Sequence, residues 1–215
     1  EIIEVLGKGS FGAVCRAKDV YNGGADRAIK FHNFSGDALN EMHNYNLFYQ
    51  KPDFTKVPMV EQFFRIFHNG VPYICASMEM LSHSLYRAIH HGTVFPYPFA
   101  TLVMRNVLEG FRYLHEVVGI AHLDVSPANI AFKDPFELKQ YNLPASPHIR
   151  IIDFNTSQPP NKIKNCTRYI PGFRAPEVCM NIGYTNSADI FAVGAVAFFM
   201  VKGFDFFPAY ETVTN

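Results

Sequence analysis

The sequence predicts an α+β fold in which a β-rich first part, residues 1–80, precedes a helical second part, residues 81–215. Two observations support this prediction. Before Leu81, short segments of alternating apolar residues are separated by glycine-containing turns, which is typical of antiparallel strands. After Leu81, apolar residues recur at the 3.6-residue spacing of amphipathic helices. The sequence therefore favours a sheet and a helical unit that join near Leu81.

Residues 1–31 are predicted to form three antiparallel strands. Their alternating apolar positions are interrupted at a glycine-rich loop, residues 7–12, and again at residues 22–24, where Asn-Gly-Gly is a good hairpin turn. The next segment, residues 38–49, has apolar side chains at helical spacing, and Ser35 offers an N-cap before it. One helix is therefore expected after the third strand.

Two more strands, residues 59–67 and 72–80, are expected around the turn at residues 68–70, where His-Asn-Gly favours a hairpin. The second part contains two clear helical segments. Residues 99–118 have one apolar stripe and end before a glycine. Residues 190–201 are wholly apolar, but a membrane span needs roughly 20 residues. This run is therefore predicted to be a buried core helix.

Composition and charge exclude several classes of protein. With 215 residues, 48% of them hydrophobic, the chain is long enough to bury a core as one domain or two small lobes. Lys and Arg together number 19, as do Asp and Glu, so no basic field favours nucleic acid. The four cysteines have no CxxC spacing, which favours reduced thiols in a cytoplasmic or nuclear protein. No secretory signal peptide is visible.

The glycine-rich loop follows the pattern Gly7-x-Gly9-x-x-Gly12. Glycines allow a tight turn, and they let backbone N–H groups approach phosphates without a Cβ in the way. A similar pattern marks dinucleotide-binding folds, but those require a helix directly after the glycines. Here the next residues, 13–17, resemble a strand. The loop is therefore interpreted as the turn of a phosphate-binding hairpin.

The residues with the most information lie at 121–130, where Asp124 and Asn129 follow a histidine. Asp153 comes later, in Ile-Ile-Asp-Phe. Phosphoryl transfer needs a carboxylate that orients a hydroxyl, and it needs an amide and a second carboxylate for Mg²⁺. A single Asp in a loop is more often a turn residue. The ordered set instead predicts a phosphoryl-transfer site.

With Ala28-Ile29-Lys30 and Ala175-Pro176-Glu177 also present, the chain resembles a eukaryotic protein kinase domain of the serine/threonine type. The resemblance extends from Glu1 to about Pro208. It implies a two-lobed fold: a β-rich N-lobe with one main helix, residues 1–80, and a helical C-lobe, residues 81–215. The resemblance also implies that this domain is incomplete, truncated after the buried apolar helix.

The resemblance further implies ATP and Mg²⁺ as cofactors and assigns roles to individual residues. Asp124, Lys30 and Glu41 are the expected catalytic residues, with Lys30 gripping the α- and β-phosphates and pairing with Glu41. Asn129 and Asp153 are the expected metal ligands. The residues expected to bind ATP are Leu6, Gly7, Lys8, Gly9, Ser10, Phe11, Gly12, Ala13, Val14, Ala28, Lys30, Met78, Glu79, Leu81 and Ala131. The resemblance also implies that Asp189 caps the backbone of the segment that contains Asp124.

Five residues depart from the family pattern. Leu123 replaces the arginine that usually docks a phosphorylated activation loop. Ser126 and Ala128 occupy the positions where serine/threonine and tyrosine kinases place a cation, so no charge from this segment balances the γ-phosphate. Asn155 replaces the glycine after Asp-Phe and is expected to keep the left-handed turn. Ile170 replaces a threonine. These losses put the rate of transfer in doubt, whereas the ATP and Mg²⁺ residues are intact.

The predicted function is transfer of the ATP γ-phosphate to Ser or Thr hydroxyls of a protein substrate. One alternative is a pseudokinase that binds nucleotide and acts as a scaffold. Another is a small-molecule phosphotransferase of the same fold, which the pattern Asp-x-Ser-Pro-x-Asn also resembles. Residues 171–178 are similar to the cell-division-cycle kinase that fires replication origins. No nucleic acid or membrane partner is expected, and a regulatory subunit is left open.

Overall fold

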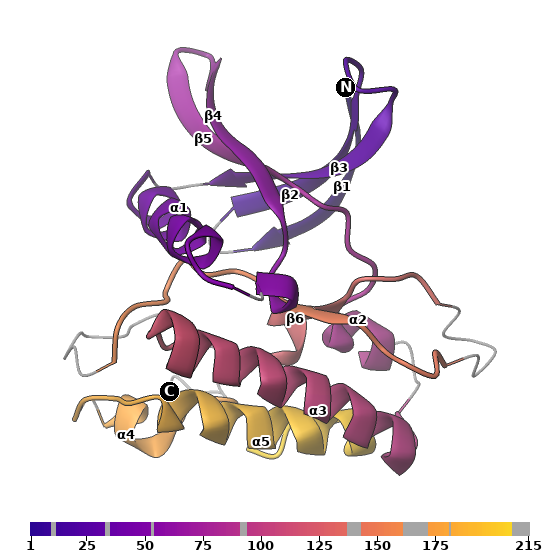
Figure 1. The fold of residues 1–215 in the computed structure, drawn as a ribbon, viewed down its shortest axis with the longest axis vertical. Coiled ribbons are helices and arrows are strands. Elements are labelled where there is room, and N and C mark those ends of the chain that lie inside the picture. The colour runs from indigo at the N-terminus through magenta and orange to yellow at the C-terminus, as the bar shows by residue number, and fades with distance from the viewer. Residues whose placement is uncertain are drawn as a thin grey trace, which may run out of the picture.

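A computed structural model describes residues 1–9, 12–32, 35–52, 54–90, 94–136, 143–160, 172–180 and 182–207. An antiparallel sheet with one long helix beside it forms the upper half of the molecule, and helices form the lower half (Figure 1). This arrangement confirms the predicted α+β fold, with a β-rich N-lobe and a helical C-lobe. The sheet ends at Met78 and the next helix begins at Leu85, and the domain division at residue 80 stays a prediction.

The N-lobe sheet confirms the five predicted strands. Its order is β1–β2–β3–β5–β4, with β1 (Ile2–Gly9), β2 (Gly12–Asp19), β3 (Ala25–His32), β4 (Val60–His68) and β5 (Val71–Met78). The turn between β4 and β5 has positive φ at both central residues, Asn69 (50°) and Gly70 (77°). A type I′ hairpin turn requires this geometry, and Asn-Gly adopts it at low cost.

The predicted helix is α1 (Ser35–Tyr49), which begins at Ser35 rather than at residue 38 and ends at the predicted residue. Its buried positions are Ala38, Glu41, Asn44, Tyr45 and Phe48. These positions recur at spacings of three and four residues, so they form one face of the helix. Because Glu41 and Asn44 belong to this face, α1 presents polar groups to the interior as well as aromatic rings.

The C-lobe is built on two long helices, α3 (Tyr97–Arg112) and α5 (Ser187–Lys202), which lie side by side (Figure 1). The helix predicted over residues 99–118 is divided: α3 passes into a π-helical turn, η2 (Tyr113–Val118). Residues 113–118 contain no Pro or Gly, so the sequence gave no signal for this change in the helix. No helix within the described ranges is both long enough and apolar enough to cross a membrane.

Short elements connect the strands of the N-lobe sheet and the long helices. They are α2 (Leu85–His90), η1 (Phe54–Lys56), η3 (Pro127–Asn129), β6 (Ile130–Phe132), β7 (Ile149–Ile151) and α4 (Pro176–Cys179). The strands β6 and β7 pair antiparallel, with Ile130 opposite Ile151. Just beyond this pair, the Ile152 N–H donates to the Asn129 carbonyl at 2.9 Å. The ladder therefore places the segments around Asn129 and Asp153 side by side.

The apolar core runs from the N-lobe into the C-lobe. Phe154, which is fully buried, is central to it: its ring centroid lies 4.7 Å from that of Phe48 and 5.6 Å from that of Tyr45, both on α1. The His122 ring lies 5.1 Å away on the C-lobe side. Edge-to-face aromatic pairs contribute about 0.5–1.5 kcal/mol each beyond their buried area. Phe154 thereby ties α1 to the segment that contains Asp124.

Candidate functional site

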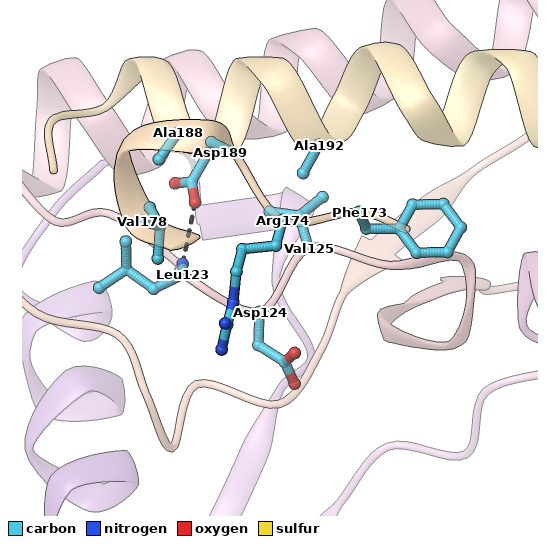
Figure 2. A pocket seen from close by; sticks show the side chains of 10 residues that line it. Leu123, Asp124, Val125, Phe173, Arg174, Val178, Ala188, Asp189 and Ala192 are labelled. Atoms are coloured by element: carbon cyan, nitrogen blue, oxygen red, sulfur yellow. Dashed lines mark hydrogen bonds between the residues drawn. The ribbon is translucent and has the colours of Figure 1, made fainter. Parts of the chain in front are cut away.

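The segment around Asp124 is held from below by Asp189 on α5. The Asp189 carboxylate accepts the backbone N–H of His122 at 2.7 Å. It also accepts that of Leu123 at 2.9 Å, the bond drawn in Figure 2. Leu123 has a φ of 66°, a left-handed conformation that is costly for a branched side chain. Asp189, which is 1% exposed, compensates this cost by accepting both bonds. The contact fits the capping role that the resemblance gave Asp189.

The His122 ring fixes the next residue along the segment. Its Nδ1 accepts the Asp124 N–H at 3.2 Å, so its Nε2 carries the proton and donates to the Ile152 carbonyl at 3.0 Å. These two bonds connect the segment before Asp124 with the segment before Asp153. The His122 imidazole therefore connects the backbone next to Asp124 with the backbone next to Asp153.

Asp124 and Asn129 are joined directly. The Asn129 Nδ2 donates to the Asp124 backbone carbonyl at 2.8 Å and to Oδ2 of its side chain at 2.9 Å. Both N–H groups of the amide are thus used, and its Oδ1 is left as an acceptor. Burial raises the pKa of Asp124 and the negative charge of Asp153 raises it further, whereas the Asn129 bond and the Lys30 charge offset only part of this effect. Asp124 and Asn129, five residues apart in the sequence, are thus a hydrogen-bonded carboxylate–amide pair in the structure.

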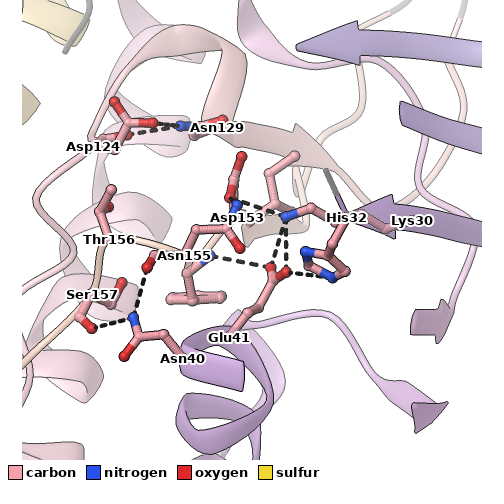
Figure 3. A network of polar contacts seen from close by, with 12 residues as sticks. Lys30, His32, Asn40, Glu41, Asp124, Asn129, Asp153, Asn155, Thr156 and Ser157 are labelled. Carbon is pink, nitrogen blue, oxygen red and sulfur yellow. Dashed lines mark hydrogen bonds and ion pairs between the residues drawn. The ribbon is translucent and has the colours of Figure 1, made fainter. Parts of the chain in front are cut away.

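Lys30 connects the sheet, α1 and the Asp153 segment. Its Nζ lies 2.9 Å from the Glu41 carboxylate and 3.0 Å from Asp153 Oδ1 (Figure 3). Lys30 and Glu41 are 7% and 1% exposed, so this is a buried ion pair. Burial alone would lower the pKa of Lys30, but the two carboxylates outweigh it and raise that pKa. The predicted contact between Lys30 and Glu41 is therefore present.

His32 belongs to the same network, although the sequence gave no reason to select it. It lies two residues after Lys30 on β3, so both side chains leave the same face of the sheet. Its Nε2 lies 3.2 Å from Glu41 Oε2. Burial, followed by the charge of Lys30, lowers the pKa of His32 from its usual 6.5 to about 4. The imidazole is therefore neutral near pH 7.

The burial of His32 predicts a pH dependence of stability. The unfolded chain takes up a proton near pH 6.5, whereas the folded chain does so only near pH 4. The free energy of unfolding should therefore fall as the pH is lowered from about 6.5 to about 4. Urea titrations across this range test the expectation. His32→Leu should flatten the slope and His43→Leu, at an exposed position of α1, should keep it; equal slopes in both variants would contradict it.

The backbone after Asp153 corrects one expectation. The left-handed residue of this turn is Asp153 itself, with a φ of 69°, and Asn155 is not among the described residues with positive φ. The Asn155 side chain instead donates from Nδ2 to Asp153 Oδ1 at 2.6 Å. A glycine at this position could not make that bond. The substitution at Asn155 therefore adds a contact to the predicted metal ligand.

The glycine-rich segment forms a hairpin, as expected, because β1 and β2 pair with Gly9 opposite Gly12. A Cβ added to Gly12 would lie 1.8 Å from the backbone oxygen of Phe31, so only glycine fits there. Around Gly7 and Gly9 no atom of the described residues, apart from the chain neighbours, comes within 4 Å of an added Cβ. Gly12 is thus required by packing against β3, and only the other two leave open space for a ligand. The predicted residues Ser10 and Phe11 lie outside the described residues.

Three of the residues expected to bind ATP, Met78, Glu79 and Leu81, lie at the end of β5 or just after it. Met78 pairs with Ala28 across β5 and β3. The Glu79 N–H donates to the Met59 carbonyl at 2.9 Å, so of its backbone groups only the carbonyl could serve adenine. The Glu79 side chain accepts a bond from Arg150 Nε, also at 2.9 Å. The other predicted ATP contacts that the structure describes lie on β1, β2, β6 or beside β5: Leu6, Lys8, Ala13, Val14, Leu81 and Ala131.

Comparison with known proteins identifies the family. The protein kinase domain family matches residues 1–215, the whole chain. The chain belongs to the protein kinase family. A crystal structure of a kinase domain superposes with a TM-score of 0.80 at 21% identity, over 98% of this chain and 66% of that one. This likeness supports the fold alone.

The curated relatives of the kinase domain include dual-specificity kinases. The human dual specificity protein kinase CLK2 is 25% identical over 225 residues, covering 98% of this chain and 44% of CLK2. A probable dual specificity kinase of Encephalitozoon cuniculi, a YAK1 homologue, is 28% identical over 224 residues, covering 99% of this chain and 50% of that protein. The chain thus spans about half the length of the curated relatives it matches.

A pocket lies between the segment around Asp124 and α5. Besides Leu123 and Asp124 it is lined by Phe173, Arg174 and α5 residues, and Figure 2 shows the Arg174 side chain extending past Leu123.

Of the departures from the family pattern, Ile170 lies outside the described residues. Ser126 is 1% exposed, and its Oγ finds no hydrogen-bond partner among the described residues.

Proposed function

We propose that this kinase domain transfers the γ-phosphate of ATP to Ser or Thr hydroxyls of protein substrates. One observation carries the proposal: Lys30 meets both Glu41 and Asp153, while Asp153 is tied through Ile152 to the Asn129–Asp124 pair. A cation for phosphates, two oxygen donors for a metal and a carboxylate for the acceptor hydroxyl thus share one connected network. Phosphoryl transfer depends mainly on such positioning and on charge neutralisation.

The proposed metal ligands are Asn129 and Asp153. Their donor set fits Mg²⁺, which prefers oxygen ligands. Asn129 donates its amide N–H groups to Asp124, so its Oδ1 is the atom that would bind a cation. A bound Mg²⁺ would neutralise charge on the β- and γ-phosphates. Lys30 would hold the α- and β-phosphates, and Asp124 would orient the acceptor hydroxyl and accept its proton.

The direct test is transfer of labelled γ-phosphate from Mg·ATP to a generic protein substrate. The kinase should label Ser or Thr, and chelation of Mg²⁺ by EDTA should abolish the labelling. A parallel panel of small alcohols and aminoglycosides distinguishes a small-molecule phosphotransferase. Labelling of that panel alone would reject a protein substrate, and transfer that is insensitive to EDTA would reject the metal ligands.

Acceptor specificity is a finer part of the proposal. Several matched relatives are described as dual specificity kinases, so tyrosine should be included among the acceptors. The similarity of residues 171–178 to the cell-division-cycle kinase stays a prediction, as do the cytoplasmic or nuclear compartment and a regulatory subunit. Phosphoamino-acid analysis of the labelled substrate separates serine and threonine from tyrosine.

The alternative, a pseudokinase that binds nucleotide without turnover, is favoured by Ser126. This residue is buried and uncharged where a cation is expected. Nucleotide binding without any labelled product would support this alternative, since the contacts of Lys30 and Asp153 would remain.

Ser126→Lys tests whether the γ-phosphate lacks a neutralising charge. If transfer is measurable, the new cation should raise kcat by roughly ten- to a hundredfold, because it would act mainly in the transition state. The KM for ATP should change less, since Lys30 and the metal hold the ground state. Ser126→Met, an unbranched side chain without charge, is the matched control for added volume. An unchanged or lower kcat in the lysine variant would mean that the charge is supplied elsewhere.

A further inference from the structure

Two asparagines of α1 face the segment that follows Asp153. Asn40 and Asn44 are four residues apart, so they lie one above the other on the same face of the helix. Asn44 is 2% exposed. Polar side chains on the buried face of a helix are costly unless they are hydrogen-bonded. Their partners therefore indicate what this face of α1 is built to hold.

Every amide N–H of the two side chains is donated to one short stretch of backbone. Asn40 Nδ2 donates to the carbonyls of Asn155 at 2.6 Å and Ser157 at 3.1 Å (Figure 3). Asn44 Nδ2 donates to the carbonyls of Phe154 at 2.9 Å and Ser157 at 3.1 Å. Four hydrogen bonds thus go to three backbone carbonyls, and the Ser157 carbonyl oxygen accepts two of them, one on each lone pair.

Glu41, between the two asparagines on α1, completes the pattern. Its Oε1 accepts the Phe154 N–H at 3.3 Å while its carboxylate holds Lys30. One turn of α1 therefore binds both donors and acceptors of residues 154–157. A shift of that segment by one residue would break all these bonds together, so the register is fixed.

The segment needs such support because it starts from a costly conformation. Asp153 is left-handed, at a φ of 69°, and from there its carboxylate reaches Lys30. Left-handed backbone at a non-glycine residue persists only where the surroundings hold it. The bonds from Asn40 and Asn44 begin one residue after Asp153, and the Asn155 side chain returns to Asp153 Oδ1.

We propose that Asn40 and Asn44 are positioning residues that clamp residues 154–157 to α1, so that Asp153 stands at Lys30 before any ligand binds. The inference rests on the proposed function, because it concerns how the proposed metal ligand is held. Neither asparagine touches the nucleotide in this scheme. They act by holding Asp153 at Lys30.

The test compares Asn40→Asp with Asn46→Asp, the same change at an exposed position of α1. Asn40→Asp places a carboxylate against two carbonyls, whereas Asn46→Asp adds the same charge elsewhere on the helix. Hydrogen–deuterium exchange is measured on peptides that span residues 152–157, without ligand. Exchange should accelerate by about tenfold in Asn40→Asp, the equivalent of one or two net hydrogen bonds. It should stay unchanged in Asn46→Asp.

Asn44→Leu provides a second variant of similar volume, and the melting temperature of each variant shows whether it folds. Faster exchange at residues 152–157 in folded Asn40→Asp or Asn44→Leu, with Asn46→Asp unchanged, supports the clamp. Equal exchange in all folded proteins overturns it. In transfer assays kcat should fall with little change in the KM for a protein substrate. If the parent chain transfers no phosphate, the proposed function fails, and the exchange result still decides the clamp.

Discussion

Replacing Asp124 with alanine should lower kcat for phosphate transfer by about 10²- to 10⁴-fold, the usual contribution of a positioned acid or base. Asn129 donates one bond to the Asp124 carboxylate and one to its backbone carbonyl, and His122 accepts its backbone N–H. The alanine variant loses the group that orients the acceptor while this scaffold remains. The affinity for Mg·ATP should therefore change little, since Lys30 and Asp153 are untouched.

The control for this change is Asp134→Ala, which removes a carboxylate from an exposed surface pair with His148. That variant should keep the parent kcat. Steady-state rates at saturating ATP and the nucleotide dissociation constant should be measured for both. Equal kcat values for Asp124→Ala and the parent chain would show that Asp124 is not the catalytic carboxylate.

Lys30→Met should reduce the free energy of unfolding by about 3–5 kcal/mol, because it leaves a buried carboxylate without its cation. Glu41 is 1% exposed and depends on Lys30 for charge compensation. The double variant Lys30→Met, Glu41→Leu should recover most of this loss, since it replaces the ion pair by apolar groups. Urea unfolding of the single and double variants forms the required thermodynamic cycle.

The surface pair Lys56–Glu109 offers a matched comparison. Its side chains are 22% and 42% exposed, and such pairs contribute about 0–1 kcal/mol. Lys56→Met should therefore change the free energy of unfolding far less than Lys30→Met. If both changes had the same small effect, the Lys30–Glu41 pair would have to be solvated rather than buried.

Much of the fold could be predicted because its signals are local. Asn-Gly specifies the β4–β5 turn through the conformational preferences of two adjacent residues. The strands and long helices follow from apolar periodicity. The contact between Lys30 and Glu41, which are 11 residues apart, was also predicted, because Lys30 ends a strand and Glu41 is an acid on the helix that follows.

The parts that were missed depend on contacts between distant residues. Asn40 and Asn44 have partners 110 to 117 residues away, so their neighbours in the sequence give no reason to select them. His32 has the pattern of an ordinary strand residue, and only the fold brings Glu41 beside it. The left-handed residue was expected at Asn155, by analogy with glycine, but it is Asp153, whose carboxylate contacts Lys30 from a distant strand.

The separation of Lys30 and Asp153 along the chain has a consequence for synthesis on the ribosome. The two residues are 123 positions apart. At about 5–20 residues per second, roughly 6–25 seconds pass between their additions. During this interval the nascent N-lobe lacks Phe154, whose ring covers Tyr45 and Phe48. Chaperones that recognise exposed aromatic surface therefore have a defined period in which to bind, and it closes when residues 153–157 emerge and dock on α1.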